Sequence, residues 1–403
     1  MAAADVCDLL VVGGGINGAG IAGPTLAYWL HRAGHIPTLI EHAPTLRTGG
    51  YVIDFWGLGY DVARRMGIEA ALRDTGYQVQ ALRAVDSTGR KQAQVSVDAF
   101  RRATDGRYTS IARSDLAAEI YGTVADDVET IFGDTITAID DRTDGVGLTF
   151  ANAPEREVDL VIGADGLHST VRQLVFEGAG THERYLGCMV AAYVANGYRP
   201  RDELTYVTYN IPGRQVARFA LREDRTLFLF VGRAEQPCDG GDLEACRAWL
   251  GTEFGDAGWE CPQILAAVDG AEDVYFDAVS QIRLERWTQG RVALVGDAVA
   301  CPSLLAGEGT GLAMLEAYVL AGELHAANGD HVKAFAAYER RLRSFVEGKQ
   351  DSALRMVGFF AAETTLGIWL RNLGMRAAQF PVVANLIVAR SFRDDFEMPD
   401  YPF

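Results

Sequence analysis

A run of glycines near the N-terminus constrains the fold of this chain more than any other feature. The sequence GGGINGAGIAGP covers residues 13–24 and directly follows an apolar segment at residues 9–12. Glycines at a strand-to-helix turn let the backbone approach a pyrophosphate, and the N-terminus of the next helix offers N–H groups to the phosphates. A second apolar segment at residues 37–40 ends at Glu41, whose carboxylate can accept hydrogen bonds from a ribose. This pattern predicts the opening β-α-β unit of a dinucleotide-binding fold.

The glycine run contains two overlapping GxGxxG sequences, and both stay open as the phosphate loop. They use, in order, Gly13, Gly15 and Gly18, or Gly18, Gly20 and Gly23. In the second frame, the interval between the last glycine and Glu41 is close to the usual one of about 20 residues. It also puts Pro24 in the first helical turn, whereas in the first frame Pro24 would kink the helix at a cost of about 3 kcal/mol. We favour the second frame, although its strand must then accommodate glycines.

Two further glycine-containing motifs follow segments that are predicted to be buried strands. GADGLHSTVR, at residues 163–172, contains Asp165 and Gly166. Asp165 there either faces a ligand or caps N–H groups of its own turn, and the sequence leaves both roles open. GDAVACPSLLAGEG, at residues 296–309, places Asp297 where it can accept a hydrogen bond from a sugar hydroxyl. The stretch at residues 302–309 can present backbone N–H groups to the ring of a bound ligand. Such donors would stabilise negative charge that develops on the edge of that ring.

In this order, the three motifs resemble those of the FAD-dependent aromatic-hydroxylase superfamily, the p-hydroxybenzoate hydroxylase type of flavoprotein monooxygenase. The resemblance implies that the second motif lies near the FAD pyrophosphate and that the third binds the ribityl chain and the flavin ring. The implied cofactor residues are Gly18, Gly20, Gly23, Glu41, Asp165, Gly166, Asp297, Pro302, Gly307 and Gly309. The chain departs from the family pattern at Ala300, where a histidine is usual, and at Gly311, where an asparagine is common.

Two local segments are similar to tetracycline-inactivating flavin monooxygenases. The sequence RTGGYVID, at residues 47–54, resembles a segment in which an arginine contacts NADPH and an aspartate contacts FAD. That resemblance implies these roles for Arg47 and Asp54, although a solvated surface position stays open for Arg47. Arg113 resembles the arginine of the same group that binds FAD near its ribityl and phosphate portion. A cation there would offset phosphate charge in a protein whose net charge is −17.

The sequence predicts an α/β fold in three parts. A Rossmann-like FAD-binding domain is expected over residues 1–182 and 285–345, with an inserted antiparallel β-sheet domain for the substrate over residues 183–284. A C-terminal helical segment is expected over residues 346–403. Runs rich in β-forming residues occupy 186–194, 204–210, 215–221 and 226–232 of the insert. Their aromatic side chains either line a ligand cavity or pack beneath the sheet: Tyr206, Tyr209, Phe219, Phe228 and Phe230.

The resemblance implies an FAD monooxygenase that uses NADPH or NADH and O₂ to hydroxylate an aromatic or polyketide-like small molecule through a flavin C4a-hydroperoxide. No catalytic residue is assigned, because the flavin carries the difficult chemistry. Two alternatives stay open: an FAD-dependent dehydrogenase or reductase without oxygen insertion, and a flavin- or ligand-binding protein without turnover.

Composition limits the partners of this chain. Its net charge of −17 argues against nucleic acid and anionic membranes, and no apolar run has the length of about 18 residues expected of a membrane span. Six scattered cysteines without a CxxC pair, and an N-terminus without a secretion signal, predict a cytoplasmic protein with no metal site. We expect a monomer or a homodimer.

Overall fold

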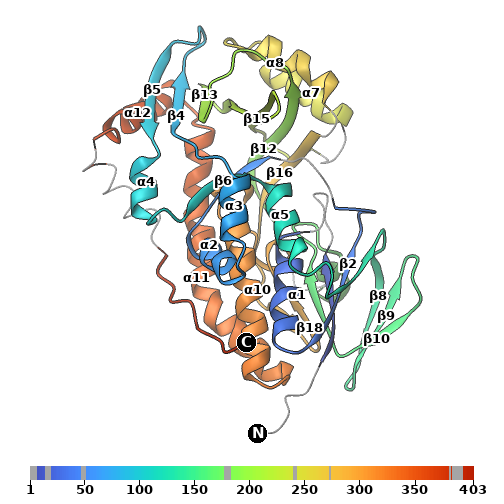
Figure 1. Ribbon diagram of the computed structural model, residues 1–403. Helices are drawn as coiled ribbons and strands as arrows, with labels where there is room; N and C mark the ends of the chain where they lie inside the picture. Colours follow the sequence, from blue (N-terminus) through green and yellow to red (C-terminus); the bar gives the residue numbers. More distant parts are fainter. Residues whose placement is uncertain are drawn as a thin grey trace.

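The computed structural model describes residues 7–13, 20–46, 51–176, 183–238, 243–271, 274–380, 383 and 394–403. Two of the predicted cofactor residues, Gly18 and Arg47, lie outside these ranges. The described chain forms two main sheets with helices between and around them (Figure 1). The α/β fold expected from the sequence is confirmed.

The first sheet is a parallel sheet with one antiparallel edge, in the order β17-β18-β11-β1-β2-β7. In its centre, Val11 of β1 lies opposite Leu39 of β2 and Ile162 of β11. These strands are mostly apolar because other elements cover both faces of this parallel sheet. The strands are β1 (Asp8–Gly13), β2 (Ile36–Glu41), β7 (Glu129–Phe132), β11 (Leu160–Ala164), β17 (Thr288–Gln289) and β18 (Val292–Leu294).

Helix α10 is the central helix of the molecule, and its side chains are buried from Leu312 to Leu324. It packs against α1, α2 and α11. These helices are α1 (Ala22–Arg32), α2 (Gly57–Arg65), α10 (Gly309–Ala326) and α11 (His331–Phe360). A Cβ atom on Gly59 of α2 would lie 2.3 Å from the Cα of Gly311, so the two backbones cross with no room for a side chain at Gly59. Gly311 therefore lies at a close contact between two helices, at the position where the resembled family commonly has an asparagine.

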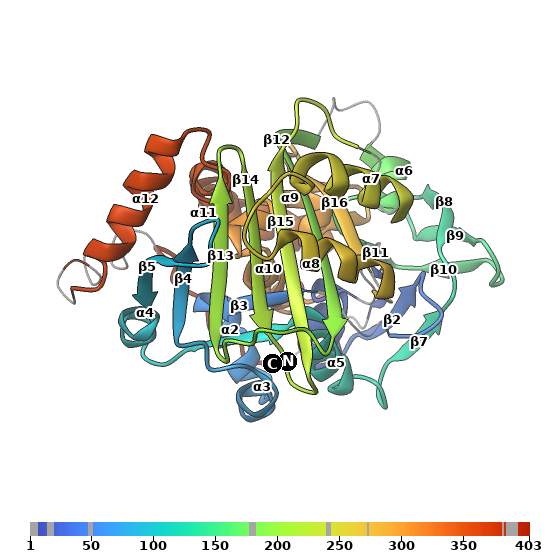
Figure 2. The same cartoon turned by 90° about the horizontal axis from the view of Figure 1, so that it is seen from above.

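The second sheet has the order β16-β12-β15-β14-β13-β4-β5. The predicted runs of the insert appear in it as β12 to β15, and helices α7 (Leu243–Phe254) and α8 (Cys261–Ala267) cover its outer face (Figure 2). Strands β4 and β5 come from the range assigned above to the FAD-binding domain, and β4 pairs with β13 in parallel. The strands are β4 (Ala81–Val85), β5 (Lys91–Ser96), β12 (Glu183–Asn196), β13 (Thr205–Ile211), β14 (Arg214–Ala220), β15 (Arg225–Arg233) and β16 (Val274–Ile282).

The aromatic residues of the insert divide between the two faces of this sheet, because neighbouring side chains along a strand point to opposite sides. Tyr209, Phe228 and Phe230 join the core beneath α7 and α8. Tyr206 and Phe219 lie on the opposite, inner face, where their rings stack with centroids 4.4 Å apart. Only the inner pair therefore lies on the side that faces the first sheet.

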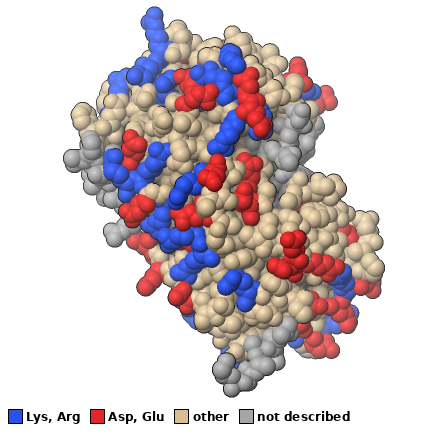
Figure 3. Space-filling view, in the orientation of Figure 1, with Lys and Arg blue, Asp and Glu red and all other residues tan. Residues whose placement is uncertain are grey.

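The remaining elements are shorter and lie around the two sheets. Strands β3 (Val52–Trp56) and β6 (Tyr108–Ala112) form a small antiparallel pair, and β8 (Ile136–Asp141), β9 (Val146–Phe150) and β10 (Arg156–Val158) form a small sheet. Acidic side chains gather over the β8–β10 region on the face shown in Figure 3. The other helices are α3 (Glu69–Thr75), α4 (Asp98–Ala103), α5 (Arg113–Gly122), α6 (Thr170–Phe176), α9 (Asp297–Ala300) and the 3₁₀ turns η1 (Val268–Gly270) and η2 (Leu304–Ala306).

The C-terminal part consists of two helices and an extended tail. Helix α11 runs unbroken through residue 345, α12 (Thr365–Ala377) packs against β5 and β13, and residues 394–403 have no helical structure. Within the described ranges, no single helix has both the length and the apolar character of a membrane span; α11 and α12 meet that test only as a pair, which is bent by 107°.

Candidate active site

A cavity lies between the first sheet and the inner face of the second sheet, with about 1130 Å³ of space within it and its opening to solvent. The N-terminal ends of α1 and α10 border it, and so do the second and third sequence motifs. Strands β1 and β11 end on this side, and ligands of open α/β sheets bind beyond the carboxyl ends of their strands. The cavity is therefore placed where the fold would hold a dinucleotide.

The structure brings together most of the predicted cofactor residues that it describes. Those that line the cavity are Gly20, Arg113, Gly166, Asp297, Gly307 and Gly309. Asp54 lines a smaller neighbouring pocket, which shares Gly307 with the cavity. Four others do not belong to the lining: Gly23, Glu41, Asp165 and Pro302.

Gly23 and Glu41 occupy structural positions beside the predicted phosphate loop. Gly23 lies in the first turn of α1, where a Cβ atom would be 3.7 Å from side-chain atoms of both Leu39 and Val11. Glu41 ends β2 and is 2% exposed, and its Oε1 accepts a hydrogen bond from the Ala43 N–H at 2.8 Å. Because α1 begins at Ala22, Pro24 is in the first helical turn, as the second glycine frame assumes. The loop residues that would decide between the frames lie outside the described ranges.

The side chains of the second motif hold its own turn together. Asp165 accepts hydrogen bonds from the Ser169 hydroxyl at 2.5 Å and from the Val171 N–H at 3.0 Å. Burial raises the pKa of Asp165, and the bond from Ser169 opposes that shift. Arg172 donates to the carbonyls of Ala298 at 2.8 Å and Leu167 at 2.6 Å, which links this motif to the third. Of the two roles left open for Asp165, facing a ligand or capping its own turn, these hydrogen bonds correspond to capping.

The third motif turns sharply before it reaches the cavity. Gly296 has a φ of +67°, a conformation that favours glycine, and its N–H donates to Glu316 Oε2 at 2.5 Å. Asp297 follows and faces the cavity; burial raises its pKa, and the Arg113 cation opposes this shift. Gly307 has a φ of +68° just before α10 begins at Gly309. Pro302 lies behind this loop, where its carbonyl accepts a hydrogen bond from Gln281 Nε2 at 2.8 Å.

Asp54 lies in β3 of the small β3–β6 pair, and Arg113 directly follows β6. Helix α5 begins at Arg113, and the Arg113 N–H donates to the Tyr51 carbonyl at 3.1 Å. Asp54 is open to the smaller pocket, and one of its oxygens accepts from the Tyr108 hydroxyl at 2.8 Å and the Ser110 hydroxyl at 2.5 Å. Burial among these strands raises the pKa of Asp54, and both hydrogen bonds oppose the shift.

Several cavity residues were missed by the sequence analysis. Tyr51 and Tyr275 bring their ring centroids to 5.4 Å, and burial raises the pKa of Tyr51 to about 12. His168 places Nε2 3.4 Å from Asp277 Oδ2, and this hydrogen bond raises the pKa of His168. Strand β16, which carries Tyr275 and Asp277, ends before the third motif and belongs to none of the three motifs. The one available signal was a carboxylate interrupting an otherwise apolar strand.

The donor groups around the cavity fit FAD. Two helix N-termini, which attract phosphate and other anionic groups, border it together with the Arg113 cation. Ser280 also lines it, and its hydroxyl is buried without a hydrogen-bond partner among the described residues. Such a group requires a partner when it is removed from water, and a polar cofactor atom would supply one.

Comparisons with known proteins agree with this geometry. The sequence pattern of the family described as "FAD binding domain" matches residues 7–351. An uncharacterized protein of Mycobacterium tuberculosis is 39% identical over 342 residues, covering 83% of this chain and 91% of that protein. A flavin-dependent monooxygenase of Legionella longbeachae is 35% identical over 346 residues, covering 83% and 86% of the two chains.

A solved structure extends the similarity to nearly the whole chain. The crystal structure of tetracycline destructase Tet(55) has a TM-score of 0.84 and 32% identity, and it covers 98% of this chain and 99% of that one. The family match spans far more than half of the sequence and includes both sheets and the cavity. The chain therefore belongs to the FAD-binding aromatic-hydroxylase superfamily and is an FAD-dependent monooxygenase.

Proposed function

We propose that this protein is an NAD(P)H-dependent monooxygenase that hydroxylates an aromatic or polyketide-like small molecule. One substrate molecule, O₂, NAD(P)H and a proton would give the hydroxylated product, NAD(P)⁺ and water. The observation that carries the proposal is that one cavity joins the cofactor motifs to the inner face of the second sheet. FAD, when bound, supplies the electron transfer and oxygen activation that side chains cannot perform.

The residues of the chain would bind and orient FAD in separate regions of the cavity. Asp297 would accept a hydrogen bond from the ribityl chain, and Arg113 would offset phosphate charge nearby. The backbone around Gly307 and Gly309 would present N–H groups to the ring. The glycine loop with Gly18, Gly20 and Gly23 would approach the pyrophosphate, with Glu41 toward the adenosine ribose. Arg47 would contact the nicotinamide cofactor, Asp54 would contact FAD, and Asp165, Gly166 and Pro302 would hold the surrounding loops.

The substrate would lie against the inner face of the second sheet. Tyr206, Phe219 and Tyr275 belong to the apolar cluster on that face, and Tyr51, the residue before β3, joins it. The rings of Tyr51 and Tyr275, which line the cavity, would position a planar substrate and keep water from the reacting atoms, with Tyr206 and Phe219 packed in the same cluster. His168, held by Asp277, would retain its proton to a higher pH than an ordinary histidine and place a positive charge at the cavity wall. The name of the related tetracycline destructase supports a substrate of this kind.

An isotope experiment tests the proposal against both alternatives. The purified protein is loaded with FAD, supplied with NADPH or NADH under ¹⁸O₂, and screened with aromatic and polyketide substrates. We expect substrate-stimulated NAD(P)H oxidation and one ¹⁸O atom in the product. Product without ¹⁸O would identify a dehydrogenase or reductase. Bound FAD without nucleotide oxidation, for any substrate, would identify a binding protein without turnover.

A further inference from the structure

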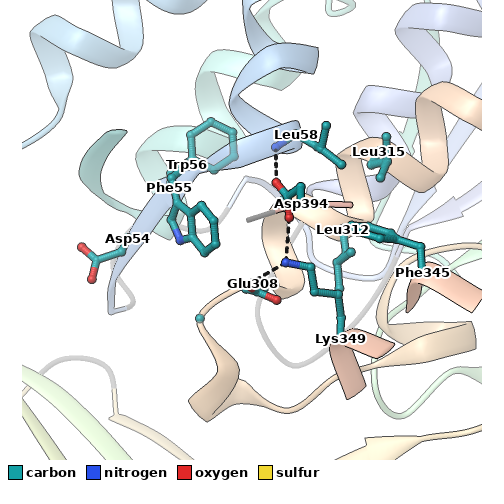
Figure 4. A pocket seen from close by; sticks show the side chains of 13 residues that line it. Asp54, Phe55, Trp56, Leu58, Glu308, Leu312, Leu315, Phe345, Lys349 and Asp394 are labelled. Carbon is teal, nitrogen blue, oxygen red and sulfur yellow. Dashed lines mark hydrogen bonds and ion pairs between the residues drawn. The ribbon is translucent and has the colours of Figure 1, made fainter. Parts of the chain in front are cut away.

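The C-terminal tail, residues 394–403, is linked to a loop of the cofactor cavity through one largely buried lysine. Lys349 of α11 places Nζ 3.0 Å from Glu308 Oε1 and 2.7 Å from Asp394 Oδ1 (Figure 4). The three side chains are only 13%, 17% and 16% exposed, in that order. Three charges from separate segments are thus held together where little water reaches them, and both carboxylates depend on Lys349 for compensation.

Asp394 also binds the beginning of α2. Its Oδ2 accepts a hydrogen bond from the Leu58 N–H at 3.3 Å, and α2 has no side-chain cap from its own N-cap residue, Trp56. A carboxylate at a helix N-terminus is stabilised by the free N–H groups there. Gly57 permits the approach, because it has a φ of +67° and a Cβ atom would lie 2.7 Å from Asp394 Oδ2. The contact between Asp394 and α2 therefore requires a glycine at position 57.

Glu308 connects this charge cluster to the cofactor cavity. It stands between Gly307, which lines both the cavity and the smaller pocket, and Gly309, which lines the cavity and begins α10. Lys349 is further fixed by the Trp56 ring, whose centroid is 5.5 Å from Nζ. Any displacement of Glu308 would move the backbone that is expected to present N–H groups to the flavin ring.

The far end of the tail is anchored independently of Asp394. The Pro399 carbonyl accepts a hydrogen bond from the Tyr318 hydroxyl at 2.9 Å, and the Tyr401 hydroxyl donates to Glu323 at 2.6 Å. The Phe403 ring lies 4.8 Å from the Trp29 ring, between centroids. These contacts dock the tail on α10 and α1, so the residues that follow Asp394 help to hold it near Lys349.

We propose that Lys349 is a positioning residue for the cofactor loop, tying Glu308 to Asp394 so that residues 307–309 keep their FAD-binding arrangement only while the tail is docked. The assignment of FAD as the ligand of this loop rests on the proposed function. Without Lys349, the Glu308 and Asp394 carboxylates face each other with no counter-charge. Separating them requires the loop, the tail or both to move.

The test compares Lys349→Met with Lys333→Met, a matched change on the same helix. Among the described residues Lys333 pairs with Asp330 alone, and its side chain is 78% exposed. In Lys349→Met we expect the FAD dissociation constant to rise by about tenfold or more, which corresponds to about 1.4 kcal/mol. In the apoprotein, hydrogen exchange should accelerate in peptides covering both 303–312 and 394–403. The absorption band of the bound flavin should shift, and Lys333→Met should resemble the wild type in every measurement.

An unchanged FAD affinity and unchanged loop exchange in Lys349→Met would overturn the proposal, even if the free energy of unfolding fell. If that variant does not fold, Asp394→Asn against Asp400→Asn decides the question. Asp400 pairs with Arg65 at 3.3 Å, is 95% exposed and does not touch the loop. Only Asp394→Asn should weaken FAD binding and loosen residues 303–312. A wild-type protein that binds no FAD would contradict the proposed function, while exchange in the apoprotein would still decide whether tail and loop are linked.

Discussion

At the scale of single residues, Asp297 carries the most direct expectation. It faces the cavity from the N-terminus of α9, and Gly296 and Glu316 fix the turn that aims it. Asp297→Ala should weaken FAD binding by about 10- to 100-fold, the range expected for losing a hydrogen bond to a charged group. Equilibrium dialysis with FAD measures this, and Asp330→Ala on the surface serves as the control. Full FAD retention with normal reduction would exclude the ribityl role.

His168 gives a prediction about pH. Its hydrogen bond to Asp277 raises its pKa in the folded protein, so the stabilisation is fully present below the unfolded pKa of about 6.5. That stabilisation is lost as pH rises through the folded pKa. Wild type should therefore exceed His168→Gln in free energy of unfolding more at about pH 5.5 than at about pH 9.

Urea unfolding of the two proteins at both pH values checks this, with His31→Gln on the exposed end of α1 as the control. Asp277→Asn should return the His168 pKa toward its ordinary value in an NMR titration. A pH-independent stability difference would show that the pair is not formed in solution.

At the scale of elements, the crossing of α2 and α10 depends on Gly59. A Cβ atom there would meet backbone rather than a movable side chain, so Gly59→Ala should destabilise the protein by about 1–3 kcal/mol. Gly251→Ala in α7 is the control, because a Cβ at Gly251 meets nothing within 4 Å. It should stabilise the protein by about 0.5–1 kcal/mol through helix propensity. Chemical denaturation of both variants measures the contrast.

The two glycine frames make opposite predictions for the first βα turn. Gly18 belongs to both, so Gly18→Val should block FAD loading by placing a branched side chain against the pyrophosphate. Gly13 belongs only to the first frame and is the last residue of β1. Gly13→Val should therefore leave FAD binding nearly intact if the second frame is correct. Flavin content after purification separates the two, and loss of FAD in Gly13→Val would favour the first frame.

Local sequence patterns predicted those helices and strands that are specified by neighbouring residues in the sequence. The β1–α1–β2 unit and strands β12 to β15 follow from strand-like runs and glycine punctuation. Helices α7 and α8 were missed because the insert was interpreted as sheet alone. The pairing of β4 with β13 could not be predicted, since two edges distant in sequence meet only in the folded chain. The same reason hid Tyr275 and Asp277, which become cavity residues only when β16 approaches the second motif.

At the scale of the whole molecule, the motifs predicted the class of cofactor better than the details of its site. Gly20, Arg113, Gly166, Asp297, Gly307 and Gly309 converge on one cavity. Their roles were inferred from the resemblance to flavoprotein monooxygenases, together with backbone chemistry at the glycines and charge at Arg113. The contribution of the tail could not be predicted from local sequence. Lys349, Asp394 and Glu308 lie in three separate segments, and they form ion pairs only in the folded chain.

The parallel pairing of β4 with β13 limits how this protein can be recombined with its relatives. The second sheet is built from two stretches of sequence, residues 81–96 and the later insert, separated by β6, β7 and the second motif. A fragment cut at residues 183–284 would leave the edge of β13 unpaired and prone to association with other chains. Grafting the second sheet of one enzyme onto another therefore requires two simultaneous exchanges, one for each of these stretches of sequence.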